Sequence, residues 1–255
     1  MPGFWCSAQH FGNILAIFKP VVGDFYEHYS NQGFFDSLVR PRHRCLNIEE
    51  KQNMWLQVVR YYMAILILFG VPVGLLMWLV IHPFHKLLRH VGLLWAYLIV
   101  AVPLTLLAGT TLWFRDVLLA TDYGTNYLLM ALSVAPFALA VAIYLGHRKY
   151  LTLPIVVGVP ELTGGQKGVL LTEGIYGRIR HPRYVESVLW ILGYALFTNY
   201  LTLYLVFLLT LPVIHIIVLL EEKELKERFG HDYEEYCRRV PRYIPKITWA
   251  SQKAA

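Results

Sequence analysis

The sequence contains few charged residues. Asp, Glu, Lys and Arg make up 16% of its 255 residues, whereas soluble domains carry about 25%. Hydrophobic residues reach 56% and the mean hydropathy is +0.46. This composition excludes an ordinary soluble domain and predicts an all-α, polytopic membrane protein. The net charge of +6 comes from dispersed basic residues that follow apolar segments. It therefore suits loops beside anionic lipid headgroups and argues against a nucleic-acid partner.

Cysteines and nucleotide-binding motifs are also scarce. Cys6, Cys45 and Cys237 lie far apart and form no CxxC pair, which argues against a disulfide framework or a zinc site. The glycine-rich "TGGQKG" at 163–168 lacks the spacing of a P-loop, and no GxGxxG follows a strand pattern. A soluble Rossmann-type cofactor domain is thereby excluded. The N-terminus shows no signal-peptide pattern, so no cleaved leader is expected.

Four windows without charge dominate what the sequence does contain. They are Tyr61–Ile81, Val91–Phe114, Gly124–Gly146 and Ser187–Leu220. Each can cross a hydrocarbon core of about 30 Å as a helix. The fourth would measure about 51 Å as one helix, which is too long for one crossing. Thr198-Asn199-Tyr200 interrupts it and predicts a helical hairpin of 183–197 and 201–220. About five transmembrane helices result, and the last two form the hairpin.

The chain changes character after this hairpin. Leu225, Phe229, Tyr233 and Tyr236 recur at helical spacing in a charged segment. Gly230 is expected to end one helix, and a second starts near Asp232. The chain is therefore expected to divide into three regions. They are an interfacial N-terminal extension (1–57, with a helix near Phe11–Phe18), a three-helix membrane region (58–150), and a loop, hairpin and helical tail (151–250).

The distribution of Lys and Arg predicts the orientation. Basic residues gather in the turn after the first helix and in the loop between the third and fourth helices. They are Lys86, Arg89, Arg148, Lys149, Lys167, Arg178, Arg180 and Arg183. Positive loops stay inside, which places this loop and the C-terminal tail in the cytoplasm. Arg40, Arg42, Arg44, Lys51 and Arg60 before the first helix oppose this assignment. Either the orientation is reversed or the N-terminal segment folds back along the surface.

Two polar blocks flank the hairpin. Residues 174–187 supply cations and hydrogen-bond donors, and the segment from Glu221 onward supplies Glu221, Glu222 and Glu224. Because a hairpin returns to its starting side, we expect both blocks to meet at one membrane face. Ordinary charge pairing beside a membrane helix is one interpretation. A ligand site is the other, since clustered ionisable groups at membrane depth often mark function.

The order of residues favours the second interpretation. "GIYGRIRHPRY" precedes the hairpin and "EEKELKERFGHDYEEYCRRVPRYIP" follows from its end. This pair of motifs resembles the isoprenylcysteine carboxyl methyltransferase and phospholipid methyltransferase superfamily, integral membrane enzymes that use S-adenosylmethionine. The resemblance covers about 170–245. One departure is Glu186, which stands where the family usually has glycine.

The resemblance implies roles for individual residues. Arg180 and Glu222 are the candidate catalytic residues. Arg180 would anchor a carboxylate acceptor through bidentate bonds, and Glu222 would serve as general base for an amine or thiol acceptor. The candidate cofactor-binding residues are Gly174, Tyr176, His181, Pro182, Tyr184 and Glu221. Carboxylates complement the cationic groups of the cofactor, and aromatic rings offer cation–π contacts.

Each assignment has a structural alternative. Arg180 could simply pair with a carboxylate, His181 could cap the hairpin, and the tyrosines could be interfacial aromatics. His82, His85 and His90 suggest a metal cluster, but they are expected in a short basic turn without acidic partners, so no metal site is predicted.

The sequence therefore predicts methyl transfer from S-adenosylmethionine to a small or lipophilic acceptor in the membrane, with the site on the cytoplasmic face. The sequence does not decide between an isoprenylcysteine carboxylate, a lipid amine and a thiol as the acceptor. It does not decide the oligomeric state either. The first alternative is an NADPH-dependent membrane reductase of the sterol-reductase type. A non-enzymatic membrane module is the second.

Overall fold

The computed structural model describes residues 48–150 and 170–246. The expected helix near Phe11–Phe18, the basic residues at 40–44 and the glycine-rich turn at 163–168 lie outside this part of the chain. The described residues from Met54 onward belong to one compact unit. Within the described ranges every element is helical, apart from an isolated bridge between Asp122 and Tyr200. The predicted all-α class is thus confirmed for these ranges.

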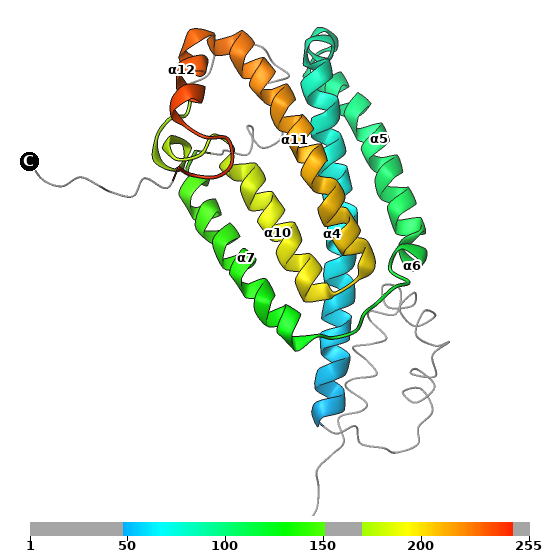
Figure 1. The fold of residues 1–255 in the computed structure, drawn as a ribbon. Helices are drawn as coiled ribbons and strands as arrows, with labels where there is room; N and C mark the ends of the chain where they lie inside the picture. The colour runs from blue at the N-terminus through cyan, green and yellow to red at the C-terminus, as the bar shows by residue number, and fades with distance from the viewer. Residues whose placement is uncertain (1–47, 151–169, 247–255) are drawn as a thin grey trace, which may run out of the picture. The chain divides into compact units, whose positions relative to one another are not determined.

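Five long helices and three shorter ones make up the described chain (Figure 1). They are α4 (Ile48–Val91), α5 (Leu93–Trp113), α6 (Arg115–Leu118), α7 (Tyr127–His147), the 3-10 helix η1 (Gly174–Gly177), α10 (Pro182–Thr198), α11 (Leu201–Phe229) and α12 (His231–Arg239). Among the described helices, four are long and apolar enough to cross a membrane: α4, α5, α7 and α11. The remaining long helix, α10, has 17 residues. At 1.5 Å per residue it measures about 26 Å.

The outer surfaces of the four long apolar helices are themselves hydrophobic. Leu94 on α5, Leu128 on α7 and Leu209 on α11 are 70%, 69% and 67% exposed. Soluble monomers rarely expose contiguous apolar surface on this scale. A bilayer supplies the apolar surroundings that such side chains need, so these helices form an integral membrane protein.

The first membrane helix is longer than predicted. We expected it to end at Ile81 and placed Lys86 and Arg89 in a turn, which is wrong. The helix α4 continues to Val91, and the chain turns at Gly92, whose φ is +84°. Charges could not mark this boundary because they lie on the last turns of the helix and face α11. There Lys86 Nζ lies 3.0 Å from Glu227 Oε2.

The hairpin before the tail is confirmed. The helix α10 ends at Thr198, Asn199 adopts a left-handed conformation with φ +57°, and α11 begins at Leu201. Asparagine tolerates this conformation because its short polar side chain bonds locally. On its other side α10 packs tightly against α7 (Figure 1). A Cβ atom added at Gly193 would come within 2.6 Å of the Phe137 ring.

The tail also follows the prediction. The helix α11 ends at Phe229, Gly230 has φ +58°, and α12 begins at His231. Tyr233, Tyr236 and Val240 are buried together in a small core. This core fixes α12 against the polar end of the hairpin.

Arg60 is not a loop charge, although it was counted as one in predicting the orientation. It is 1% exposed and its Nε donates to the carbonyl oxygen of Thr198 at 2.9 Å. Its guanidinium also pairs with Asp122 and lies over the Tyr200 ring. Arg60 therefore joins α4 to the turn of the hairpin, at the end opposite the tail.

Candidate functional site

Two backbone hydrogen bonds bring the polar blocks together. The amide of Arg180 donates to the carbonyl oxygen of Pro241 at 2.9 Å, and that of His181 donates to Arg242 at 3.2 Å. His181 occupies the N-cap position of α10 without a side-chain capping bond, and Pro182 is buried in the first turn, where a residue without an amide proton fits best. The segment after α12 therefore lies along the residues that start α10, as the hairpin argument requires.

Glu222 lies at the centre of this site. It is 5% exposed, and side chains from both sides of the hairpin bind its carboxylate. His181 Nε2 lies 3.1 Å from Oε1, and Arg180 contacts the same oxygen at 3.3 Å. Arg242 binds both oxygens, with Nε 2.9 Å from Oε1 and a terminal nitrogen 2.6 Å from Oε2. A buried carboxylate is tolerated only with such compensation.

The neighbouring carboxylate, Glu221, is less fully bonded. Its Oε2 lies 3.8 Å from His181 Nδ1, too far for a hydrogen bond. This buried oxygen has no hydrogen-bond partner in the described chain, and the same is true of Arg180 Nε and Tyr233 Oη. Burial and then the charge of Glu222 raise the pKa of Tyr233, so its phenol stays neutral. One acceptor and two donors at this end can thus receive a polar ligand.

The turn Gly174–Gly177 forms a second wall of the site. Gly174 has φ +60°, and a Cβ atom there would lie 2.8 Å from Tyr150 Oη. The Tyr176 ring packs edge-on against Tyr150, and the Tyr236 hydroxyl donates to the Tyr176 carbonyl oxygen at 2.7 Å. Burial, followed by the charge of Glu221, raises the pKa of Tyr176 to about 12. Tyr176 therefore offers a neutral phenol at physiological pH.

Tyr184 lies on the side of the site that faces α4. Its ring centroid is 5.9 Å from that of His181, and it packs against the buried cluster that includes Trp78 and Ile217. Arg183 lies over the Trp78 ring at 5.0 Å. Tyr184 thus connects the site to the apolar interior between α4 and α11.

Glu224 does not join the other two carboxylates. Its Oε2 lies 3.2 Å from His82 Nδ1 on α4, and Arg89 is 3.8 Å from Oε1. Two positions further along a helix point about 200° away, so Glu222 and Glu224 face different neighbours. The expectation that His82 lies in a turn without acidic partners was also wrong.

Glu186, the departure from the family pattern, faces α7. Its Oε2 lies 2.5 Å from His147 Nε2, and its Oε1 accepts a hydrogen bond from Trp190 Nε1 at 3.0 Å. His147 is the last residue of α7 and is 2% exposed. Glu186 therefore forms a largely buried pair between two helices.

Sequence reasoning gave no role to Arg242 or His147. Arg242 was quoted within the closing "VPR" motif, and a lone cation among prolines could have marked it. His147 carried no such signal, because its partner stands 39 positions away. The sulfur of Cys237 accepts a contact from the Arg180 guanidinium.

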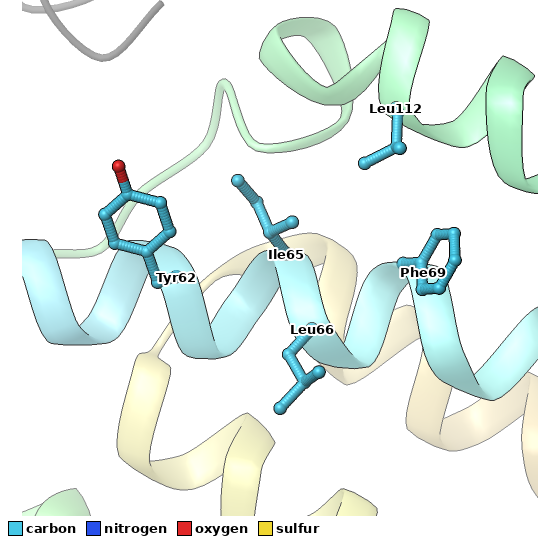
Figure 2. A pocket seen from close by; sticks show the side chains of 5 residues that line it. All are labelled: Tyr62, Ile65, Leu66, Phe69 and Leu112. Atoms are coloured by element: carbon cyan, nitrogen blue, oxygen red, sulfur yellow. The ribbon is translucent and has the colours of Figure 1, made fainter. Parts of the chain in front are cut away.

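An apolar hollow of about 300 Å³ lies elsewhere, between α4 and α5 (Figure 2). Its lining residues are Tyr62, Ile65, Leu66, Phe69 and Leu112. Phe69 and His82 are separated by 13 positions, which is about 20 Å along a helix. The hollow is therefore not part of the charged site.

Comparison with known proteins supports the motif resemblance. Residues 130–232 match the family described as phospholipid methyltransferase. This range contains most of α7, the whole hairpin and the start of α12. No solved structure matches the chain significantly.

Three curated relatives illustrate the range of similar proteins. A protein-S-isoprenylcysteine O-methyltransferase of Schizosaccharomyces pombe is 38% identical over 31% of this chain and 34% of its own length. A nickel-cobalt-cadmium resistance protein of Alcaligenes xylosoxydans xylosoxydans is 29% identical over 34% of this chain and 41% of its own. A Delta(14)-sterol reductase of Mus musculus is 32% identical over 39% of this chain and 25% of its own length. The chain thus matches well under half the length of these relatives.

Proposed function

We propose that the chain is an integral membrane methyltransferase that transfers a methyl group from S-adenosylmethionine to a lipophilic acceptor. One observation carries the proposal. Arg180 and His181 from before the hairpin, and Arg242 from the tail, all bind Glu222 at the end of α11. These four residues belong to the two motifs that resemble the methyltransferase superfamily, and together they join both motifs into one site.

The chemistry of the site fits S-adenosylmethionine. When bound, this cofactor supplies a methyl group on a positively charged sulfur. Glu221 presents a buried oxygen without a hydrogen-bond partner in the described chain, which suits the amino group or the sulfonium charge. Tyr176 and Tyr184 offer ring faces for cation–π contact. The tight turn at Gly174 and the helix start at Pro182 shape this side of the site.

Glu222 is proposed as a positioning residue, in place of the general base that the sequence suggested. Both of its oxygens already accept bonds from Arg242, and Oε1 also contacts His181 and Arg180. A carboxylate with this many donors has little remaining capacity to accept a substrate proton. It instead holds Arg180 and His181 in place, and Arg180 keeps one buried nitrogen for a ligand.

The proposed site faces the cytoplasm and the proposed acceptor comes from the bilayer. The same end of the hairpin carries a surplus of basic residues, which favours the inside. Burial of Arg60 removes one of the five basic residues that opposed this orientation. The apolar surfaces of α5, α7 and α11 would let a lipophilic molecule approach the site along the membrane.

A membrane reductase that uses NADPH is the second candidate. The similarity to a sterol reductase supports it, since that protein shares a longer aligned segment than the methyltransferase relative. The two candidates differ in the cofactor that the charged site would bind.

Cofactor binding separates the candidates. The detergent-purified protein would be titrated with S-adenosylhomocysteine and with NADPH by calorimetry, beside Glu221→Gln. We expect S-adenosylhomocysteine, and not NADPH, to bind the wild-type protein. Loss of one charged hydrogen bond costs about 1.5–3 kcal/mol, so Glu221→Gln should bind it about 10- to 100-fold more weakly.

Glu227→Gln is the matched control, because Glu227 lies on the same helix and pairs with the exposed Lys86. It should bind S-adenosylhomocysteine like the wild type. Binding of NADPH alone would favour the reductase. Binding of neither compound to folded protein would refute an enzymatic site at this position.

A further inference from the structure

The pair His147–Glu186 has a feature that simple helix pairing does not need. His147 Nδ1 is buried and has no hydrogen-bond partner in the described chain, although Nε2 binds Glu186 at 2.5 Å. Buried polar side-chain atoms nearly always have partners. A pair that only joins two helices needs no buried nitrogen without a partner, so the second nitrogen calls for a separate explanation.

The partners of Glu186 decide which nitrogen carries the proton. An ionised carboxylate can only accept hydrogen bonds. The bond between His147 Nε2 and Glu186 Oε2 therefore holds its proton on Nε2, and Trp190 Nε1 donates to the other oxygen. In neutral imidazole this arrangement leaves Nδ1 as a lone-pair acceptor. A carboxylate that orients a histidine in this way also stabilises the charge formed when the second nitrogen takes a proton.

This pair lies beside the proposed cofactor turn. A Cβ atom added at Gly146, next to His147, would lie 3.2 Å from the Ile175 side chain, and Ile175 stands between Gly174 and Tyr176. The charge of Glu186 also acts on the Tyr176 phenol. His147, whose Nδ1 has no hydrogen-bond partner among the described residues, thus adjoins a position that contacts the proposed cofactor turn, at the boundary between α7 and α10.

A base at this place selects the kind of acceptor. A carboxylate acceptor is already ionised, so it has no proton for the base to remove. A thiol or an amine must lose a proton as it is methylated. We propose that His147, oriented by Glu186, is the general base for a protic lipophilic acceptor, a thiol or an amine, at the α7–α10 interface. This inference rests on the proposed methyltransferase function.

The acceptor sulfur or nitrogen, once its proton has passed to His147 Nδ1, uses the freed lone pair to form the bond to the methyl group, whose bond to the cofactor sulfur breaks. The electron pair of that broken bond stays on the cofactor sulfur, which becomes neutral. The proton of the acceptor moves to His147 Nδ1, and the resulting imidazolium is held by Glu186 until the proton passes to water.

Eight-carbon probes test this assignment, since the natural acceptor is unidentified. Octanethiol, octylamine and octanoate would be offered to the wild-type protein with labelled S-adenosylmethionine, and methyl transfer would be measured. We expect transfer to the thiol or the amine and none to octanoate. Transfer to octanoate alone, or to none of the three, would overturn the inference.

The base itself is tested with His147→Gln and Glu186→Gln. A positioned base contributes about 10²- to 10⁴-fold, so each variant should lose about 100-fold or more of the rate on the protic eight-carbon probe. An aromatic thiol, 4-butylthiophenol, is a much stronger acid than an alkanethiol, so in an assay at pH 8 it is mostly ionised and needs no base. Its methylation should fall far less. An equal loss on both kinds of acceptor would contradict the proposal.

Two further measurements keep the outcomes distinct. His82→Gln disrupts a comparable buried pair with Glu224. It should lower thermal stability as much as His147→Gln does but should not discriminate between the acceptors. Binding of S-adenosylhomocysteine should persist in every variant. If folded wild-type protein does not bind it, the proposed function fails, and the assignment of His147 fails with it. If binding persists and discrimination is absent, only the assignment fails.

Discussion

At the scale of single residues, the site depends on one buried carboxylate that several cations share. Glu222 is 5% exposed, and its interactions include the two guanidinium groups of Arg180 and Arg242. Removing one partner of a buried ion pair costs more than the pair itself contributes, because the remaining charge stays buried. The hydrogen bond to Glu222 also raises the pKa of Arg242, which keeps that side chain charged.

Arg242→Ala is therefore expected to destabilise the protein and its site together. Breaking a buried ion pair costs about 3–5 kcal/mol. Because Arg242 is itself partly exposed, we expect about 3 kcal/mol in the free energy of unfolding, together with weaker binding of S-adenosylhomocysteine. Chemical unfolding in mixed micelles and calorimetry measure the two effects.

Arg239→Ala is the control for this variant. Arg239 is 66% exposed and lies 3.8 Å from Glu235 within α12, and such surface pairs contribute about 0–1 kcal/mol. Equal effects of the two substitutions would show that Glu222 does not depend on Arg242. Arg242→Lys should recover only part of the loss, because lysine cannot bind both oxygens in the same planar geometry.

The sequence allowed part of this residue-level arrangement to be predicted. The hairpin argument and the motifs together placed Arg180, His181 and Glu222 at one end of the molecule. They could not separate Glu224 from Glu222, since that depends on which helix packs against each face of α11. They also missed the pair His147–Glu186, because nothing in the sequence links the end of α7 to the second turn of α10.

At the scale of elements, the turn η1 controls how the loop before α10 meets the tail. Gly174 adopts φ +60°, and a side chain there would meet Tyr150 Oη. Tyr236 from α12 then binds the Tyr176 carbonyl oxygen. The turn is thus held from two directions, and its shape depends on a residue without a Cβ atom.

Gly174→Ala should disturb this element without changing any charge. A left-handed conformation costs an alanine about 1–2 kcal/mol, and the contact with Tyr150 adds to that. We expect a lower thermal midpoint and weaker S-adenosylhomocysteine binding.

Gly109→Ala is the control, because Gly109 lies inside α5 with nothing within 4 Å of an added Cβ atom. It should be neutral or slightly stabilising, since alanine favours helices. Normal binding by Gly174→Ala would show that the turn plays no part in the site.

Long apolar helices were the easiest elements to predict, and α4 shows the limit. Its apolar stretch was recognised, but its end was placed ten residues too early, at Ile81 instead of Val91. Hydropathy marks where the hydrocarbon ends, whereas a helix continues as long as its backbone bonds and side-chain partners persist. Glu224 and Glu227 on α11 provide those partners for the last turns of α4.

At the scale of the whole molecule, the described chain has two polar ends with different tasks. One end holds the candidate site. At the other, Arg60 is bound by Thr198 and Asp122 and lies over Tyr200. This second cluster joins α4, the segment before α7 and the hairpin turn, and none of its residues belongs to the candidate site.

Arg60→Met should therefore separate stability from binding. It leaves Asp122 without its cation, and breaking such a buried pair costs about 3–5 kcal/mol. We expect a clearly lower thermal midpoint in detergent but unchanged affinity for S-adenosylhomocysteine at temperatures where the variant is folded. The double variant Arg60→Met/Asp122→Leu should recover part of the stability. A large loss of affinity in folded Arg60→Met would mean that the two ends are coupled.

The position of Arg242 also has a consequence for biosynthesis. The ribosome makes Arg180 and His181 first, then the 41 positions that lead from His181 to Glu222, and Arg242 a further 20 positions later. During translation Glu222 lacks its bidentate partner until nearly all of the described chain has been synthesised. A nascent chain that stalls before this arginine would hold an inserted hairpin but an incomplete charge cluster. Premature termination in the tail should therefore yield a membrane-embedded protein whose buried carboxylate keeps Arg180 and His181 but lacks its bidentate partner.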